Sequence, residues 1–163
     1  MSSVFSVRCL SDYFKEVVEK DYHKYNSSIS LGSCIHLAQG LFHMADWTFT
    51  YQKSLLESLE KMRFKSEKDI YPHLANKNRS FGIIRDIANA SKHVSLRKPS
   101  TDIKNASDLK VESRGYGMGT FGDGRYGGVN PVVSDGNQIE YLDIHMRAVF
   151  QYWSDFTKST QAG

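Results

Sequence analysis

Cysteine and proline are scarce in this chain, which has two cysteines and three prolines in 163 residues. Cys9 and Cys34 lie far apart, so they provide neither a disulfide framework nor the closely spaced pairs of a zinc knuckle. Free thiols suit a reducing compartment, and we expect the protein to be cytoplasmic. No apolar run approaches the roughly 18 residues of a membrane span, and the N-terminus lacks a signal-peptide pattern. We therefore expect no membrane partner.

Charge of one sign is limited as well. The formal net charge is +3, with a pI near 8.8, and no block of like charges stands out. A mildly basic chain permits an anionic partner such as RNA or a nucleotide without requiring one. With 40% apolar and 12% aromatic residues, the composition is that of a folded protein. The length fits a single domain over residues 1–163.

Hydrophobic periodicity predicts helices in most of the chain before Pro99. Ser11 or Asp12 is a suitable N-cap for the first helix, and Asn78 or Ser80 for the fourth. The fourth helix is expected to end at Pro99, because the residue before a proline is pushed out of helical geometry. The second is the longest, and its apolar residues from Leu31 to Leu59 predict one buried stripe. The predicted helices cover residues 11–25, 29–61, 65–74, 80–98 and 143–159.

The pattern changes after Pro99. Residues 108–117 predict a strand, and residues 115–128 hold seven of the twelve glycines. The sequence NPVVSDGNQIEYL then predicts a β-hairpin, with Asp135-Gly136 favouring a tight turn between two apolar runs.

These elements predict a mainly α fold. We expect a bundle of four to five helices, with a Gly-rich β-hairpin insertion before the C-terminal helix. The helical part covers residues 8–98, the Gly-rich loop and hairpin residues 108–141, and the last helix residues 143–159. One face of the last helix is expected to carry Ile144, Ala148, Tyr152 and Phe156.

The sequence IRDIANASKHVSL, residues 84–96, places many functional groups on what is predicted to be one helix. At about 100° per residue, Arg85, Asn89 and Lys92 fall close together, with Asp86 and His93 on one flank. Asn, Asp and His form helices less well than the Glu and Lys that usually cover a surface. Two interpretations stay open: a solvated or structural polar face, and a catalytic or ligand-binding row.

The long predicted helix has a matching polar side, with His36, Gln39, His43, Asp46 and Thr50. His43 and Asp46 are one turn apart, so the carboxylate can orient the imidazole. If the bundle brings the two polar rows together, His43, Asp46, Asn89 and His93 converge into a group suited to acid–base chemistry. Trp47 lies at the border of this row, either as a binding residue or as an aromatic at the edge of the core.

We predict neither a metal nor a cofactor. A cluster of imidazoles can hold a metal, but the spacing supplies no HxxxH pair. Gly117, Gly119 and Gly122 match G-x-G-x-x-G, a fingerprint that indicates dinucleotide binding only between a strand and a helix N-terminus. Here a hairpin follows instead, and no G-K-[ST] sequence is present.

Aromatic and basic residues alternate in the Gly-rich segment. Tyr116, Phe121 and Tyr126, together with Arg125, can contact RNA by stacking and charge. The same composition suits a loop packed across the bundle, because glycine most often marks unusual backbone geometry or close packing. Both interpretations stay open.

The sequences LFHMADW and IRDIANASKHVSL, with the Gly/aromatic segment, resemble a group of small uncharacterised bacterial and phage proteins. The resemblance covers roughly residues 30–128 and implies no established activity. The chain also distantly resembles the HEPN superfamily, helical bundles that include ribonuclease toxins and non-catalytic dimerisation modules. That family's motif is an arginine, often followed by a polar residue, and then a histidine. Arg85, Asp86 and His93 match it with a longer spacing.

The HEPN resemblance implies that His93 acts on the ribose 2′-OH or the leaving group and Arg85 on the phosphate, in a homodimer. Two hypotheses follow. One is a binding or regulatory protein, connected with phage–host conflict, whose ligand is RNA, a nucleotide or a protein. The other is a metal-independent endoribonuclease of toxin or phage-defence type that uses Arg85, Asn89, Lys92 and His93 with support from His43 and Asp46. Its RNA cleavage would survive EDTA and be lost in His93→Ala.

Overall fold

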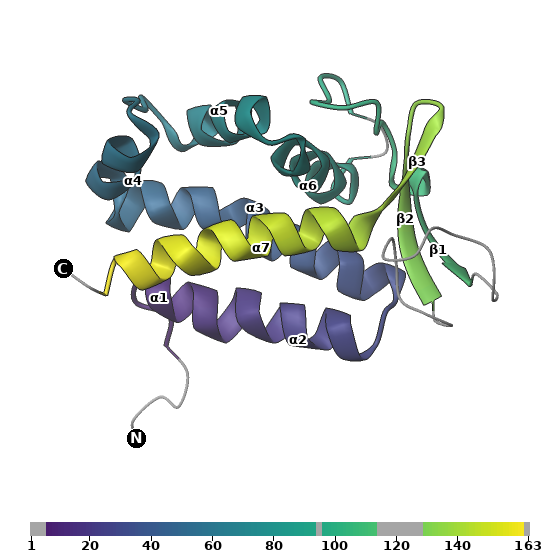
Figure 1. Cartoon of the computed structure of the whole chain (residues 1–163), viewed down its shortest axis with the longest axis horizontal. Helices are drawn as coiled ribbons and strands as arrows, with labels where there is room; N and C mark the ends of the chain where they lie inside the picture. Colours follow the sequence, from purple (N-terminus) through teal and green to yellow (C-terminus); the bar gives the residue numbers. More distant parts are fainter. Residues whose placement is uncertain (1–5, 94–95, 114–128, 162–163) are drawn as a thin grey trace.

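The structure, a computed structural model, describes residues 6–93, 96–113 and 129–161. These ranges are mainly helical, with a small antiparallel sheet just before the last helix, so the predicted fold class is confirmed (Figure 1). The helices are α1 (Leu10–Tyr13), a π-helical segment (Phe14–Val18), α2 (Glu19–Ser27), α3 (Leu31–Tyr51), α4 (Lys53–Glu60), α5 (Ile70–Lys77), α6 (Arg79–Ala90) and α7 (Leu142–Ser159). Two 3₁₀ turns, η2 (Glu67–Asp69) and η3 (Ala106–Asp108), and the strands β1 (Leu109–Ser113), β2 (Val129–Asp135) and β3 (Gln138–Tyr141) complete them.

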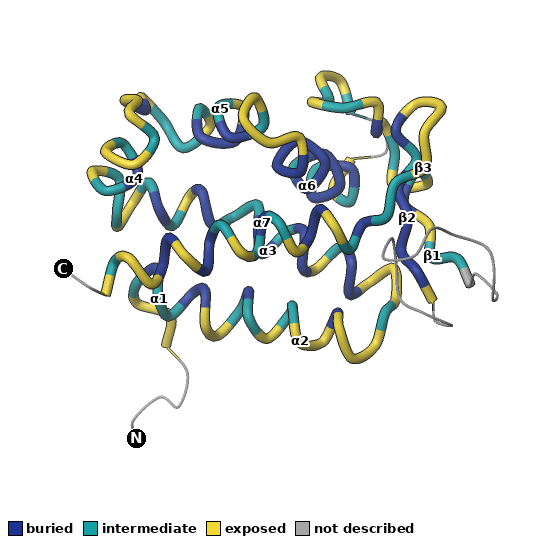
Figure 2. The backbone as a smooth tube through the Cα atoms, in the orientation of Figure 1, coloured by how far each residue is buried: buried dark blue, intermediate teal, exposed yellow. Residues whose placement is uncertain are grey.

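Helices α3 and α7 form the centre of the bundle. Helices α1 and α2 run along one side and α5 and α6 along the other, while the sheet lies at the end where α7 begins (Figure 1). The buried side of each helix faces this middle layer (Figure 2). Leu41, Met44, Ile84 and Trp153 are fully buried there. Burial of such side chains, rather than helix propensity, supplies most of the stability of a bundle.

The first helix begins slightly earlier than predicted. Its N-cap is Cys9, not Ser11 or Asp12. The Asp12 carboxylate instead accepts a hydrogen bond from the backbone N–H of Arg8 at 3.0 Å. Asp12, which lies inside the first turn, therefore holds the residues that precede the helix.

The predicted helix over residues 29–61 is two helices, because the chain breaks at Gln52 (φ −140°, ψ 29°) between α3 and α4. Thr50 Oγ1 donates to the backbone carbonyl of Asp46 at 2.9 Å, a contact that bends helices. The predicted stripe is buried in its middle, but Leu31 and Leu59 at its ends are 45% and 53% exposed. The break explains why the described residues contain six helices, counting the α1–α2 helix as one.

Side-chain caps define the starts of the next two helical segments. The Ser66 hydroxyl and the Asp69 carboxylate form a capping box around η2. Pro72 lies in the first turn of α5, where its missing N–H leaves no intrahelical bond unmade. Asn78 caps α6, as predicted, by accepting a hydrogen bond from the Ser80 N–H at 2.9 Å.

Helix α6 ends at Ala90, so the prediction that it runs to Pro99 is wrong. The Ser91 hydroxyl donates back to the carbonyl of Ala88 at 2.7 Å, and such a bond competes with continuation of the helix. Lys92 and His93 lie in the turn that follows. Their predicted positions on the polar face of one continuous helix are therefore wrong.

The predicted hairpin is confirmed. Strand β2 pairs with both β1 and β3 in antiparallel register, and Asp135 faces Gln138 across the turn. Gly136 has a φ of +64°, the conformation required at the first central position of a type II′ turn. A Cβ at this position would lie only 2.8 Å from an Asp102 carboxylate oxygen, so glycine also provides the space.

Helix α7 buries only part of the face predicted to carry Ile144, Ala148, Tyr152 and Phe156, since Phe156 lies in the core and Tyr152 packs against it. Tyr141 is both the last residue of β3 and the N-cap of α7, so the strand passes directly into the helix. Leu142 then enters the core first, followed by Met146 and Trp153, whereas Ile144 is 51% exposed. The orientation of α7 is therefore set by the hairpin that precedes it.

Candidate functional site

The polar rows on α3 and α6 lie side by side, because the two helices pack against each other. Gln39 Nε2 donates to Ser91 Oγ at 2.8 Å, directly across the helix interface. Further along, Lys92 Nζ lies 3.5 Å from His43 Nε2. The two rows therefore meet near the C-terminal end of α6, through Gln39 with Ser91 and His43 with Lys92.

A pocket opens where α3, η2, α5 and α6 meet. Its volume is about 330 Å³, at the lower end of the range of small-molecule sites. It contains three of the predicted site residues, Asp46, Arg85 and Asn89. The rest of its lining is Phe42, Ala45, Glu67, Lys68, Tyr71 and Pro72. The pocket therefore combines two acidic and two basic side chains with one amide over an aromatic floor.

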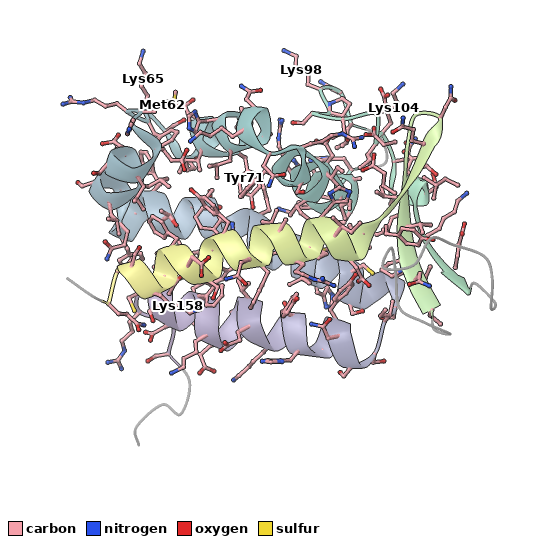
Figure 3. All side chains as sticks on the ribbon, viewed as in Figure 1. Met62, Lys65, Tyr71, Lys98, Lys104 and Lys158 are labelled. Atoms are coloured by element: carbon pink, nitrogen blue, oxygen red, sulfur yellow. The ribbon has the colours of Figure 1, made fainter. Side chains whose placement is uncertain are left out.

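Two tyrosines hold α3 in place beneath this pocket. Tyr71 points from α5 into the interior (Figure 3), where its hydroxyl donates to the carbonyl of Leu41 at 2.6 Å. The Tyr13 hydroxyl donates to the adjacent carbonyl, Gly40, at 3.3 Å. Burial raises the pKa of both phenols, so both stay protonated and act as donors. Helix α3 is thus held by side chains from α1 and from α5.

His43 and Asp46 form the pair that their spacing predicts. The Asp46 carboxylate lies 3.0 Å from His43 Nδ1, and the carboxylate side chain is 51% exposed. When Asp46 accepts the Nδ1 proton, the lone pair of Nε2 is directed at Lys92. An imidazole oriented by a carboxylate, with an ammonium group at its other nitrogen, can accept or deliver a proton at the edge of the pocket.

Asp86 has a structural role. It is buried and accepts hydrogen bonds from the Thr101 backbone N–H at 2.7 Å and the Thr101 hydroxyl at 2.8 Å. Burial raises the pKa of Asp86, against these hydrogen bonds and one from the Ser100 backbone. Its predicted position on the flank of a polar face is wrong, because Asp86 points inward and anchors the chain after α6. Arg85 reaches the same segment through the Ser100 hydroxyl.

The remaining predicted site residues lie away from the pocket or outside the described residues. His93 is exposed in the turn after α6 and does not line the pocket. Trp47 is half-buried and stacks on Tyr13. The predicted binding residues Tyr116, Phe121, Arg125 and Tyr126 lie outside the described residues.

Sequence reasoning missed two polar networks. The Glu60 carboxylate accepts hydrogen bonds from His73, Lys77 and Tyr152, on helices α5 and α7. No pattern in the sequence indicates it, since Tyr152 is 92 residues away. A network of this kind joins three helices by charge-assisted hydrogen bonds.

The second missed network fixes the hairpin to the bundle. His145 Nδ1 lies 3.0 Å from Ser80 Oγ and its Nε2 lies 2.9 Å from Glu140. Arg79 pairs with both Glu140 and Asp135. Burial lowers the pKa of His145 against the attraction of Glu140, so the neutral ring accepts from Ser80 and donates to Glu140.

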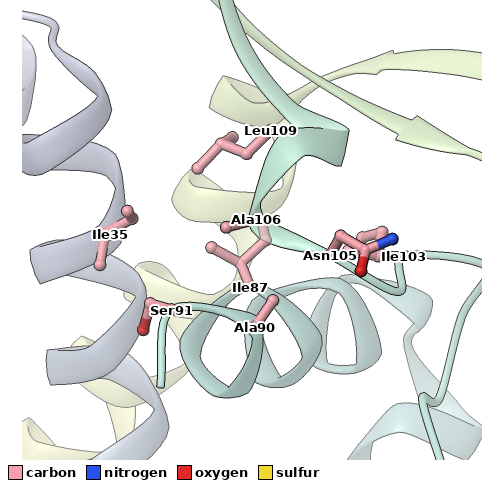
Figure 4. A pocket seen from close by; sticks show the side chains of 8 residues that line it. All are labelled: Ile35, Ile87, Ala90, Ser91, Ile103, Asn105, Ala106 and Leu109. Carbon is pink, nitrogen blue, oxygen red and sulfur yellow. The ribbon is translucent and has the colours of Figure 1, made fainter. Parts of the chain in front are cut away.

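A further hollow next to α6 is apolar and narrow. Ile35, Ile87, Ile103 and Leu109 meet there, beside Ala90 (Figure 4). The crevice has no room for a water molecule, so we interpret it as a seam of the core.

Among residues 6–93, 96–113 and 129–161, no group of three or more His, Cys, Asp or Glu side chains could hold a metal ion. In the same part of the chain, none of the helices combines the length and apolar character needed to cross a bilayer.

Comparison with known proteins gives no match. No family model, no curated protein and no solved structure is similar to the chain. The resemblance to small phage proteins and to the HEPN superfamily stays a prediction.

Proposed function

We propose that the protein is a binding module that takes a small anionic ligand, such as a nucleotide, in the α3–α5–α6 pocket. The observation that supports this proposal is the presence of Arg85, Lys68, Asn89 and Asp46 in one pocket. The guanidinium and ammonium groups suit a phosphate, and Arg can hold one with two parallel hydrogen bonds. The Asn89 amide and the Asp46 carboxylate suit the donor and acceptor edges of a base.

The proposal extends to the setting of the protein. The two free cysteines suit the cytoplasmic location expected from the sequence. A regulatory role, with another protein or a second copy of this chain as partner, is proposed with it. A connection with phage–host conflict depends only on the resemblance of LFHMADW and IRDIANASKHVSL to small phage proteins.

Arg85→Ala is expected to weaken nucleotide binding by about ten- to a hundredfold, because it removes a charge-assisted contact to phosphate. Isothermal titration calorimetry with nucleoside monophosphates and with inorganic phosphate measures the effect. Asn89→Ala should weaken nucleotide binding but leave phosphate binding intact, since the amide would contact the base. Lys104→Ala, which removes an exposed cation beside the sheet (Figure 3), is the matched control. Equal affinities for the Arg85 and Lys104 variants, or no nucleotide binding by the wild type, would contradict the proposal.

An endoribonuclease is the second candidate, and the arrangement of His43 between Asp46 and Lys92 favours it. In this proposal the Nε2 atom of His43 takes the proton of a ribose 2′-OH, and the 2′-oxygen attacks the adjacent phosphate held by Arg85. The P–O5′ bond breaks as a 2′,3′-cyclic phosphate forms, and the leaving 5′-oxygen takes a proton from water. Lys92 offsets the charge that develops there. His43 replaces His93 as the proposed base, because the Asp46 carboxylate orients the His43 ring, whereas His93 is exposed in the turn after α6.

RNA cleavage in the presence of EDTA is expected to fall at least about a hundredfold in His43→Ala, the effect of losing a general base. His93→Ala is the matched control on the exposed turn and should retain cleavage. Loss of cleavage in the His93 variant, with the His43 variant still active, would favour the HEPN-type assignment instead. Absence of cleavage by pure wild-type protein would remove the enzyme hypothesis.

A further inference from the structure

Three aromatic rings form a nearly parallel series where α1 meets α3. The rings of Tyr13 and Trp47 are 4.7 Å apart and inclined by 12°. The rings of Trp47 and Tyr51 are 5.6 Å apart and inclined by 13°. Tyr13 is buried, Trp47 is half-buried and Tyr51 is 47% exposed. The series, here called the aromatic column, therefore runs from the core to the surface.

The aromatic column differs from the ring contacts in the centre of the core. There Phe81 meets Tyr152 at 88° and Tyr71 at 67°, and Trp153 meets Phe156 at 86°. Of these rings, Phe81, Tyr71, Trp153 and Phe156 are buried in edge-to-face contacts. A parallel column that ends in a half-exposed ring instead leaves an aromatic surface on which another planar ring can stack.

The column and the pocket lie on different sides of α3. At roughly 100° per residue, Trp47 and Tyr51 are turned by about 100° and 140° around the helix from Asp46, which lines the pocket. On the pocket side, Lys68 and Arg85 line the cavity, and Lys92 contacts His43 at its edge. The cations of η2, α6 and the turn after α6 and the stacking surface of α3 thus lie on either side of the solvent-facing row of α3 that carries His43 and Thr50.

We propose that the aromatic column and the pocket together bind a single-stranded nucleic acid. One base stacks on Tyr51 and Trp47, while the adjoining phosphates lie at the cations of the pocket. The inference rests on the proposed function, and it names a polymeric ligand where the pocket alone would accept a free nucleotide. A strand that spans both surfaces gains affinity, because the second contact becomes intramolecular. Stacking on an aromatic side chain accepts any base, so binding with little sequence preference is expected.

Tryptophan fluorescence can follow this contact directly. The chain has two tryptophans, and Trp153 is fully buried, so quenching by an added strand reports on Trp47. Oligouridine and oligothymidine serve as the probes and distinguish RNA from DNA. Tyr51→Ala is expected to weaken binding of the preferred strand about tenfold, the effect of losing one stacked base. Tyr51→Phe keeps the ring and should restore binding.

Leu59→Ala is the matched control, because Leu59 is an exposed apolar side chain on α4 without a ring (53% exposed). It should bind the strand as the wild type does. In the Tyr51→Ala variant, mononucleotide binding should be unchanged, which separates the column from the pocket.

Equal strand affinity for Tyr51→Ala and the wild type, with Arg85→Ala weakened, would overturn the inference and leave the proposed function intact. The inference would also be overturned if the wild type binds no strand, or if it binds only a protein partner. Failure to bind any nucleotide as well would also overturn the proposed function.

Discussion

Glu60→Ala is expected to lower the free energy of unfolding by about 3 kcal/mol, because it leaves a set of donors without their shared carboxylate. Only 7% of the Glu60 side chain is exposed. Its oxygens accept from His73 Nε2 at 2.8 Å, Lys77 Nζ at 2.6 Å and the Tyr152 hydroxyl at 2.9 Å. The variant therefore breaks a junction of α4, α5 and α7 at once.

Urea denaturation followed by circular dichroism measures the loss at Glu60. Glu60→Gln retains an acceptor without the charge and should lose about half as much. Asp155→Ala is the matched control, since that carboxylate on α7 is 62% exposed and surface charges contribute little. A Glu60→Ala protein as stable as the Asp155 variant would show that the junction contributes nothing to folding.

Asp86→Ala is expected to destabilise the protein by about 2–3 kcal/mol. The Asp86 carboxylate is the acceptor for both the backbone N–H and the hydroxyl of Thr101. The segment that begins at Thr101 places Ile103 in the core, where its side chain is 1% exposed. Removing the Asp86 carboxylate releases this segment. The loss of hydrogen bonds thus includes a loss of apolar burial.

The Asp86 prediction is checked by thermal and urea denaturation against Thr101→Val. That variant removes one hydroxyl donor but leaves the backbone donor in place, so it should lose about 1 kcal/mol. A Thr101→Val protein less stable than Asp86→Ala would show that the hydroxyl, rather than the carboxylate, fixes this segment.

Lowering the pH should change the stability losses of Glu60→Ala and Asp86→Ala in opposite directions. Burial raises the pKa of Glu60, but the bonds from Lys77, His73 and Tyr152 outweigh it and hold the pKa below its ordinary 4.5. The stabilisation by the ionised Glu60 is therefore complete above pH 4.5 and is lost as the pH falls through the folded-state pKa. The loss of unfolding free energy in Glu60→Ala, relative to the wild type, becomes smaller in acid. Asp86 has its pKa raised by burial. The folded state then takes up the proton first, and the deficit of Asp86→Ala widens as the pH falls through that pKa.

The sequence predicts the elements of the fold well where periodicity is local. Apolar spacing indicates the helices, and Asp135-Gly136 indicates the hairpin turn, which has the predicted position. The errors occur where a side chain competes with the backbone. Thr50 bonds back to Asp46 before the break at Gln52, and Ser91 bonds back to Ala88 where α6 ends. A short hydrogen bond of this kind has no periodic signature.

The candidate site is less accessible to sequence reasoning. Spacing alone predicts the His43–Asp46 pair, because both residues lie on one helix. It also selects Asp46, Arg85 and Asn89, which the structure brings to one pocket. Lys68 and Glu67 come from a 3₁₀ turn far along the chain, and only tertiary packing places them there. For Asp86 the sequence-based prediction is wrong. Its charge indicates a surface residue, but the side chain is buried against Thr101. Catalytic and binding roles for these residues stay predictions.

The position of α7 has a consequence for synthesis of the protein on the ribosome. This last described helix supplies the central side chains of the core, with Trp153 against Phe81 and Phe156. Helices α3 and α6, which pack against α7, emerge long before it. A nascent chain therefore exposes the apolar faces of α3 and α6 until α7 has left the ribosome and packed against them, and such exposed surface favours aggregation.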